Sequence, residues 1–560
     1  MCRVLALAAV LLVLAVNGLL PTAAQHASPP AGPQASPDAA TFPLYEAVLA
    51  ERRGEVAAAT TGRLSVYTIE ATFTLAPAVP LATGAEATPV MASPAAGGEG
   101  TAAVPAATLA GRLDLRYVNG TGAEVSEIYF RLYPNAEGYA EGEIVVSDVT
   151  VDGAPSTPER GVDDTVLRVP LSTPVPPGSA ANVTMAFTTD VPTQTGDALD
   201  LFSFDPAGGT FALAYWYPLL AGYDPESGWH RDPLSELGDP LFADSALYDV
   251  TLTTLPDLVV VASGVELAAE TRDGQTRHRF VTGPARDFTV VADDDFASVS
   301  RNVGGTTVTS YYNPELAEAG AAVLEYGAQA LAVYNDLFGA YPYAELDLVG
   351  VTMPNWGGFE FSELVFIENG SYQNLATEYP PGSLEFTVAH EVAHQWWYNL
   401  VGSNQQTHAF LDEGLTEYTA IVYVERQHGP AAAERWLDLS VEVGLSFRIA
   451  AVGDGVADRP SSAFTDDRDY TNMVYRKGAA GFRALRREIG DAAYLAGLRD
   501  YATQTRFAVA VPATLRGAFE RASGRDLGPF WRGWFEEART RASVTVETPL
   551  GTPAVGTPTP

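Results

Sequence analysis

Hydrophobic and polar positions follow two different periods along the chain, and the change falls near residue 300. From Leu109 to about Ser300, short segments alternate apolar and polar residues between turn-forming residues. Segments of this kind are 113–118, 128–133, 183–187 and 248–252, and Asn119-Gly120 predicts a turn after the first. The pattern predicts an all-β domain, which we place at residues 63–300.

Beyond Pro314 the apolar residues recur with helical spacing. Leu316 to Phe338 predicts a long amphipathic helix, which Tyr341-Pro342-Tyr343 closes. Further helices are predicted at 431–450, 474–490, 493–506 and 527–539. We therefore place a second, helix-rich domain at residues 301–540.

One predicted helix of the second domain carries two histidines four residues apart. In His390-Glu391-Val392-Ala393-His394 the two imidazoles lie one above the other on the helix and point at one spot. Glu413 follows on the next helix, after a predicted break at 401–404. Two imidazoles and a carboxylate predict a catalytic zinc site with one position left open. A helix that carries two histidines by chance is a poor alternative, since the chain has only seven.

Two carboxylates near this motif have predicted roles of their own. Glu391 is placed to take a proton from a metal-activated water and to pass it to a leaving amine, which is the chemistry of peptide-bond hydrolysis. Glu417 lies four residues after Glu413 on the same helix face and can accept a ring N–H from a metal-binding histidine. Asp412 and Glu385 are alternatives for that supporting role.

Tyr475-Arg476-Lys477-Gly478 stands at the start of another predicted helix. The phenol of Tyr475 can donate to an oxyanion, although an ordinary packed tyrosine is the simpler interpretation. Lys477 is the single lysine among 33 basic residues. Its retention favours a place where an ammonium is needed and a guanidinium does not fit, unless it remains by chance.

The segment from Asn355 to Ile367 alternates like a half-buried strand. Gly357 and Gly358 allow a second backbone to approach closely, as happens when a peptide adds to an edge strand. Glu360 lies on the same face as Gly358, where a carboxylate can bind a substrate's free α-amino group. A solvated edge residue is the alternative interpretation of Glu360.

Together these segments resemble the aminopeptidase N-like family of gluzincin zinc metallopeptidases, which also contains leukotriene A-four hydrolase. The resemblance covers roughly residues 210–538 and is closest to short, two-domain bacterial members. It implies an N-terminal all-β domain followed by a thermolysin-like α/β catalytic domain with one Zn²⁺ per chain. The roles it implies are zinc ligation for His390, His394 and Glu413, general base for Glu391 and transition-state stabilisation for Tyr475.

The amine-binding strand departs from the family pattern. Gly357-Gly358-Phe359-Glu360-Phe361 is similar to the family's G-x-M-E-N strand, with Glu360 at the amine-binding glutamate. Phe359 replaces Met and Phe361 replaces Asn, and we find no clear equivalent of the glutamine that the β domain of many members contributes. The resemblance therefore implies a peptidase of peptide substrates, most simply an aminopeptidase, while an endopeptidase and a non-catalytic peptide-binding module stay open.

Composition limits the partners and the location. The net charge of −36, from 69 acidic and 33 basic residues, argues against nucleic-acid binding. It would attract a cationic substrate terminus, but solubility outside the cell is the simpler explanation of the charge. Residues 1–24 resemble a secretory signal peptide, which predicts a secreted or cell-envelope protein with no membrane contact after cleavage. An uncleaved membrane anchor is the alternative. Cleavage would remove Cys2, the single cysteine, and with it any disulfide or cysteine nucleophile.

Three low-complexity segments complete the predicted organisation. A Pro-, Ala- and Ser-rich linker is predicted at 25–62, an insertion between two strands at 77–107, and a disordered Thr- and Pro-rich tail at 541–560. The sequence does not fix the oligomeric state.

Overall fold

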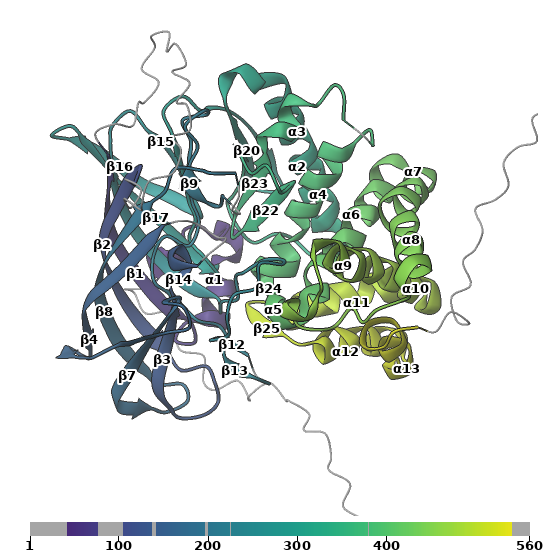
Figure 1. The fold of residues 1–560 in the computed structure, drawn as a ribbon, viewed down its shortest axis with the longest axis horizontal. Helices are drawn as coiled ribbons and strands as arrows, with labels where there is room; N and C mark the ends of the chain where they lie inside the picture. The colour runs from purple at the N-terminus through teal and green to yellow at the C-terminus, as the bar shows by residue number, and fades with distance from the viewer. Residues whose placement is uncertain are drawn as a thin grey trace, which may run out of the picture.

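The structure is a computed structural model that describes residues 42–76, 105–136, 142–196, 200–224, 226–378 and 380–539. The predicted signal peptide, the tail at 541–560 and residues 77–104 of the predicted insertion lie outside the described residues. The described chain forms a β-rich first part and a helix-rich second part (Figure 1). This arrangement confirms the expected fold class.

The first part is built on a large sheet in which, among the described residues, eight strands are ordered β16-β17-β14-β1-β2-β8-β4-β5. Neighbouring strands are antiparallel except for β1 and β14, which run parallel. The strands are β1 (Ser65–Leu75), β2 (Ala107–Val118), β4 (Glu143–Val151), β5 (Ala154–Pro155), β8 (Ala180–Val191), β14 (Ala246–Thr254), β16 (Val265–Arg272) and β17 (Gln275–Ala285). Alternate residues of β1 such as Tyr67, Ile69 and Phe73 are buried, as the two-residue period of a strand requires.

Smaller sheets share the hydrophobic core of the large one. Their orders are β15-β18-β10-β9 and β11-β3-β7-β6, with a separate β12-β13 pair. The strands are β3 (Val125–Arg131), β6 (Glu159–Gly161), β7 (Val166–Val175), β9 (Phe202–Phe204), β10 (Phe211–Leu213), β11 (Leu219–Leu220), β12 (Tyr223–Asp224), β13 (Gly228–Trp229), β15 (Val259–Ala262) and β18 (Val290–Asp293).

The second part joins a five-stranded sheet, ordered β19-β20-β21-β23-β22 in the described chain, to a group of helices. Its strands are β19 (Ala297–Val303), β20 (Thr306–Tyr312), β21 (Glu345–Val351), β22 (Gly358–Phe361) and β23 (Leu364–Glu368), and a short pair is formed by β24 (Val401–Ser403) and β25 (Ala508–Ala510). The predicted boundary between residues 300 and 301 falls inside β19.

The predicted helices of the second part are present, and the structure adds α12 and the short helices α3, α5 and α9. The helices are α2 (Ala317–Phe338), α3 (Asn369–Gln373), α4 (Ser383–Ala393), α5 (Gln405–His408), α6 (Glu413–His428), α7 (Pro430–Trp436), α8 (Val443–Val452), α9 (Asp467–Thr471), α10 (Gly478–Ile489), α11 (Asp491–Gln504), α12 (Pro512–Ser523) and α13 (Gly528–Trp531). π-Helical turns cover Gln395–Leu400, Leu437–Glu442, Asn472–Lys477 and Arg532–Glu536. No helix in the described ranges is both long enough and apolar enough to span a membrane.

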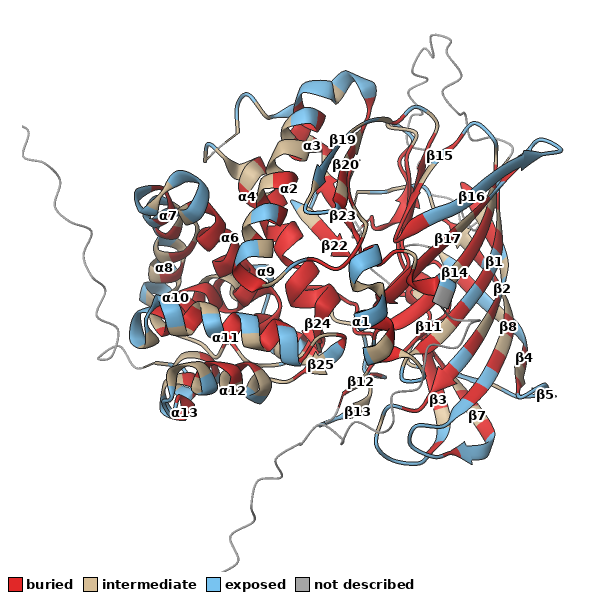
Figure 2. Cartoon of the chain, turned by 180° about the vertical axis from the view of Figure 1, so that it is seen from behind, coloured by how far each residue is buried: buried red, intermediate tan, exposed pale blue. Residues whose placement is uncertain are grey.

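The predicted linker at 25–62 is wrong from Phe42 onward. Residues Phe42–Tyr45 form a short 3₁₀ turn and Ala50–Thr60 form α1, which lies where the two parts meet (Figures 1 and 2). Tyr45 is fully buried, and Val48 bridges to Tyr343 in the second part. The physical reason is that these apolar side chains find their partners about 300 residues later, which the local Ala-rich composition does not reveal.

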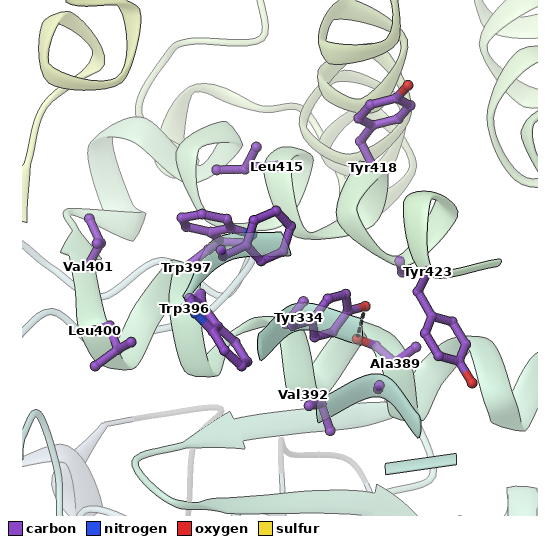
Figure 3. Packing of buried hydrophobic residues seen from close by; sticks show 14 of the residues in the cluster. Tyr334, Ala389, Val392, Trp396, Trp397, Leu400, Val401, Leu415, Tyr418 and Tyr423 are labelled. Carbon is purple, nitrogen blue, oxygen red and sulfur yellow. Dashed lines mark hydrogen bonds between the residues drawn. The ribbon is translucent and has the colours of Figure 1, made fainter. Parts of the chain in front are cut away.

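Helix α2 packs behind the helix that carries the paired histidines. Tyr334 of α2 donates a hydrogen bond of 2.8 Å to the carbonyl oxygen of Ala389, next to His390, as Figure 3 shows. Trp396 and Trp397 are 1% exposed and pack in the same cluster. The backbone kinks at Trp397, with φ −104° and ψ 49°, where α4 gives way to a π-helical turn. Buried aromatic packing on both sides therefore fixes the position of α4.

Candidate metal centre and peptide cleft

Three predicted ligand side chains converge at the junction of α4 and α6. His390 lies in the last turn of α4, His394 is the residue that caps the end of that helix, and Glu413 opens α6. Oε2 of Glu413 lies 3.2 Å from Nε2 of His390 and 3.5 Å from Nε2 of His394. One ligand atom from each of the three residues falls within 4.8 Å of the others, and all three side chains are buried. The structure thus brings together the predicted donor set.

The other ring nitrogen of each histidine faces a second carboxylate. Nδ1 of His390 lies 3.3 Å from Oε2 of Glu417, and Nδ1 of His394 lies 2.9 Å from Oδ1 of Asp412. These contacts hold the rings so that both Nε2 atoms face Glu413. Glu417 therefore lies where the sequence predicted a supporting carboxylate, and Asp412 has the same place at His394. Glu385 instead accepts hydrogen bonds from other side chains.

The electrostatics of this cluster favour a bound cation. Burial lowers the pKa of His390, but the carboxylates of Glu413 and Glu417 more than offset this and raise it to about 9. Burial raises the pKa of Glu391, next to the histidines, to about 7. Carboxylates thus outnumber imidazoles in a buried space. A nitrogen- and oxygen-ligated divalent ion such as Zn²⁺ fits these donors and would neutralise the excess negative charge.

A cavity of about 200 Å³ opens beside the cluster. It is lined by Asp239, Trp356, Gly357, Gly358, Phe359, Glu360, Phe386, Thr387, His390, Glu391, His394, Glu413, Glu417 and Tyr475. A Cβ on Gly358 would lie 2.6 Å from Oε1 of Glu391, so only glycine leaves that carboxylate room. Tyr475 donates a 2.5 Å hydrogen bond to Oε1 of Glu413, and burial raises the pKa of its phenol well above 10. Tyr475 therefore keeps its proton at the cavity wall.

Strand β22 forms one edge of the cavity. It is the outermost strand of its sheet, as predicted. The single strand predicted over Asn355–Ile367 is wrong, because the chain turns after Phe361 and β22 pairs antiparallel with β23. Glu360 is only 3% exposed and borders the cavity, together with Gly357 and Gly358. Phe361 points away into the core, where its ring packs edge-on against Tyr215 at 5.9 Å. The residue that replaces the family's Asn has thus become a core residue.

The β part supplies an acidic residue that the sequence did not reveal. Asp239 lies on the loop between β13 and β14 and borders the cavity. Burial raises the pKa of both Asp239 and Glu360 well above the usual value, and the charge of Asp239 raises the pKa of Glu360 further. Its neighbour Gly238 has φ +74°, and a Cβ there would lie 2.1 Å from the Tyr470 hydroxyl. A glycine before an aspartate was the one signal, and it is weak because such pairs are common in turns.

Lys477 lies outside the cavity. Its ammonium donates to Oδ2 of Asp454 at 2.9 Å, to the carbonyl of Glu537 at 3.0 Å and to the carbonyl of Gly455. Three acceptors surround one compact cation, which agrees with the prediction that an ammonium is needed here.

The second part of the chain is similar to a known peptidase family. Residues 322–534 match the peptidase family M1 domain. The puromycin-sensitive aminopeptidase of Caenorhabditis elegans is 25% identical over 339 residues, which cover 57% of this chain and 34% of that protein. Aminopeptidase N of Caulobacter vibrioides is 29% identical over 268 residues, covering 47% of this chain and 30% of that protein. The matches span about a third of the length of these relatives.

Solved structures share the fold over most of the chain. The M1 zinc metallopeptidase of Deinococcus radiodurans superposes with a TM-score of 0.57 at 18% identity, covering 88% of this chain and 96% of that one. The fold is thus shared with a two-part structure of a known zinc metallopeptidase. Residues 322–534 are similar to the peptidase family M1 domain, and the expected resemblance to the aminopeptidase N-like gluzincins is confirmed.

Proposed function

We propose that this protein is a secreted, zinc-dependent aminopeptidase that removes N-terminal residues from peptides. The observation that carries the proposal is one cavity that holds both the converging triad His390, His394 and Glu413 and, at the β22 edge, the acidic pair Glu360 and Asp239. The match to aminopeptidases and the M1 domain supports it.

Each residue of the cavity has a proposed task. His390, His394 and Glu413 hold one Zn²⁺ per chain, which when bound supplies a Lewis acid that polarises a carbonyl and acidifies water. Glu391 accepts a proton from the attacking water and returns it to the leaving amine. The Tyr475 phenol moves its hydrogen bond from Glu413 to the developing oxyanion.

The acidic pair is proposed to fix the end of the substrate. The substrate backbone lies along the edge of β22, where Gly357 and Gly358 leave room. Glu360 and Asp239 bind the α-ammonium group, so the scissile bond is the first in the chain. A structure of the Deinococcus radiodurans enzyme bound to a Tyr-Ser-Ala substrate supports a short peptide with a free amine as the substrate class.

An endopeptidase is the second candidate, because Phe361 has removed the polar side chain of the family's strand. One experiment separates the two. The wild type should bind one zinc and cleave free-amine aminoacyl arylamides at least tenfold faster than peptides acetylated at the amine. Glu360→Ala should weaken cleavage of the free-amine substrate by roughly tenfold or more, as expected when a buried ammonium loses its partner, and leave the acetylated peptide unchanged.

Each alternative to the zinc aminopeptidase predicts a different result. Equal cleavage of free and acetylated peptides by the wild type would establish the endopeptidase. Full zinc occupancy after His390→Ala, His394→Ala or Glu413→Ala would refute the metal site. Zinc binding without any hydrolysis would leave a peptide-binding module.

The secreted location rests on the signal-like composition of residues 1–24. Expression of the full chain in a secreting bacterial host should release protein whose N-terminus lies near Ala24. Recovery only in the membrane fraction, with Met1 retained, would support the anchored alternative.

A further inference from the structure

Gln405, the first residue of α5, lies between the amine end of the cavity and the metal centre. Its side chain is 3% exposed. Its amide nitrogen lies 3.2 Å from Oε1 of Glu360 and 2.5 Å from Oδ2 of Asp412. Because a carboxylate only accepts hydrogen bonds, both contacts require the NH₂ end of the amide, which carries two protons, one for each.

Without Gln405, the carboxylates of Asp412 and Glu360 would compete for the proton on Nδ1 of His394. Oδ1 of Asp412 lies 2.9 Å from Nδ1 of His394, and Oε1 of Glu360 lies 3.9 Å from the same nitrogen. A neutral imidazole donates a single proton, so only one carboxylate can receive it. The Gln405 amide gives Glu360 a donor of its own and occupies the second oxygen of Asp412. Asp412 thereby stays on His394, and Glu360 stays at the cavity.

The next residue anchors the other half of the acidic pair. Gln406 donates a 2.6 Å hydrogen bond to the carbonyl oxygen of Asp239 and accepts a 3.1 Å hydrogen bond from the backbone of Ser235. Adjacent glutamines of α5 therefore hold Glu360 and the loop that carries Asp239. Of the two glutamines, only Gln405 also contacts Asp412, the carboxylate that holds the ring of His394.

We propose that Gln405 is a positioning residue that holds Glu360 for the substrate's amino group and, through Asp412, holds His394 for the metal. The inference rests on the proposed aminopeptidase function and deepens it. In this arrangement, recognition of the substrate's amino group and the geometry of the metal site both depend on the side-chain amide of Gln405.

The test variant is Gln405→Met, which keeps the length of the side chain and removes both donors. Zinc affinity, measured by competition with a chelator, should fall about 10- to 100-fold, the usual effect of losing a group behind a metal ligand. In assays with enough zinc to fill the site of every variant, the KM for a free-amine aminoacyl arylamide should rise at least tenfold, while kcat/KM for the acetylated peptide stays within twofold.

Two matched controls isolate the amide. Gln406→Met removes the neighbouring side chain of the same length, and it should raise the KM for the free amine while zinc affinity stays within twofold of the wild type. Ser461→Ala removes the 3.3 Å hydrogen bond to the backbone carbonyl of Gln405, and it should leave both quantities unchanged. Thermal unfolding of all three variants identifies any general loss of fold.

The outcomes separate this inference from the proposed function. Gln405→Met with normal zinc affinity, with an unchanged KM, or with parallel losses on free and acetylated substrates would refute the positioning role. If the wild type hydrolyses nothing, the proposed function fails. Zinc affinity, together with calorimetric binding of phenylalaninamide against its N-acetyl form, then still tests Gln405.

Discussion

Glu391 illustrates how burial sets chemistry at the scale of a single residue. It lies inside the protein beside two histidines, and burial raises its pKa to about 7. A carboxyl group with that pKa can take up and release a proton near neutral pH, which is what a general base must do. Gly358 leaves it the necessary space.

Replacing Glu391 by Gln should retain zinc but lower kcat by about 10²- to 10⁴-fold, since the amide fills the same volume and cannot accept the proton. Metal analysis and steady-state kinetics of the purified variant check both parts. Turnover close to that of the wild type would mean that another group is the base.

Tyr475→Phe tests the second group at the cavity wall. Loss of the hydroxyl should lower kcat by about 10²- to 10³-fold if the phenol donates to the oxyanion, with zinc content unchanged. The substitution also removes the hydrogen bond from this hydroxyl to Glu413, but it leaves the carboxylate of Glu413 itself in place. An effect on KM alone would assign Tyr475 to substrate binding.

At the scale of elements, Lys477 connects three segments of the second part. Lys477 and Asp454 have side chains that are each 1% exposed, and the backbone N–H of Arg539 also donates to Asp454 at 2.7 Å. The end of α8, the start of α10 and the last described residues are therefore held by one buried ion pair.

Lys477→Met should destabilise the protein by about 3–5 kcal/mol, because Asp454 would be left buried without its cation. Lys477→Arg should also be harmful, since a planar guanidinium cannot match three acceptors placed around an ammonium. Urea unfolding measures both. Arg521→Met, which breaks the exposed pair with Asp500, is the control and should cost less than about 1 kcal/mol.

The helices and the cavity residues differ in how far the sequence could predict them. The spacing of His390 and His394 acts within one helix, and the period of α2 is visible along its whole length, so both were predictable. α12 was missed because few of its residues, Leu515, Ala518 and Phe519, are buried. Asp239 and Gln405 meet Glu360 only through tertiary contacts between distant segments, and local periodicity carries no information about such contacts.

At the scale of the whole molecule, Arg286 joins the two parts. It follows β17, is 2% exposed and donates to the carbonyl oxygens of Ala243 at 3.0 Å, Ala508 at 2.9 Å and Tyr398. Gly402 permits this, because a Cβ there would lie 2.2 Å from the guanidinium carbon. One side chain of the β-rich part thus satisfies backbone groups of the helix-rich part.

Arg286→Met should destabilise the protein by about 3 kcal/mol or more, since three carbonyl groups lose their donor and those of Ala243 and Tyr398 are buried. Gly402→Ala should also be destabilising, because its methyl group displaces the guanidinium. In thermal unfolding, Arg279→Met provides the comparison, as it removes a partly exposed pair with Asp249 and should cost less than about 1 kcal/mol. Equal effects of Arg286→Met and Arg279→Met would contradict this role for Arg286.

The backbone bridge between Val48 and Tyr343 has a consequence for synthesis on the ribosome. The start of the described chain cannot reach its final place until about 300 further residues have been made, which takes on the order of tens of seconds at ordinary elongation rates. During that time the apolar side chains of α1 lack their partners and are open to chaperones and proteases. Docking of α1 at the junction must therefore follow the synthesis of the second part that it packs against.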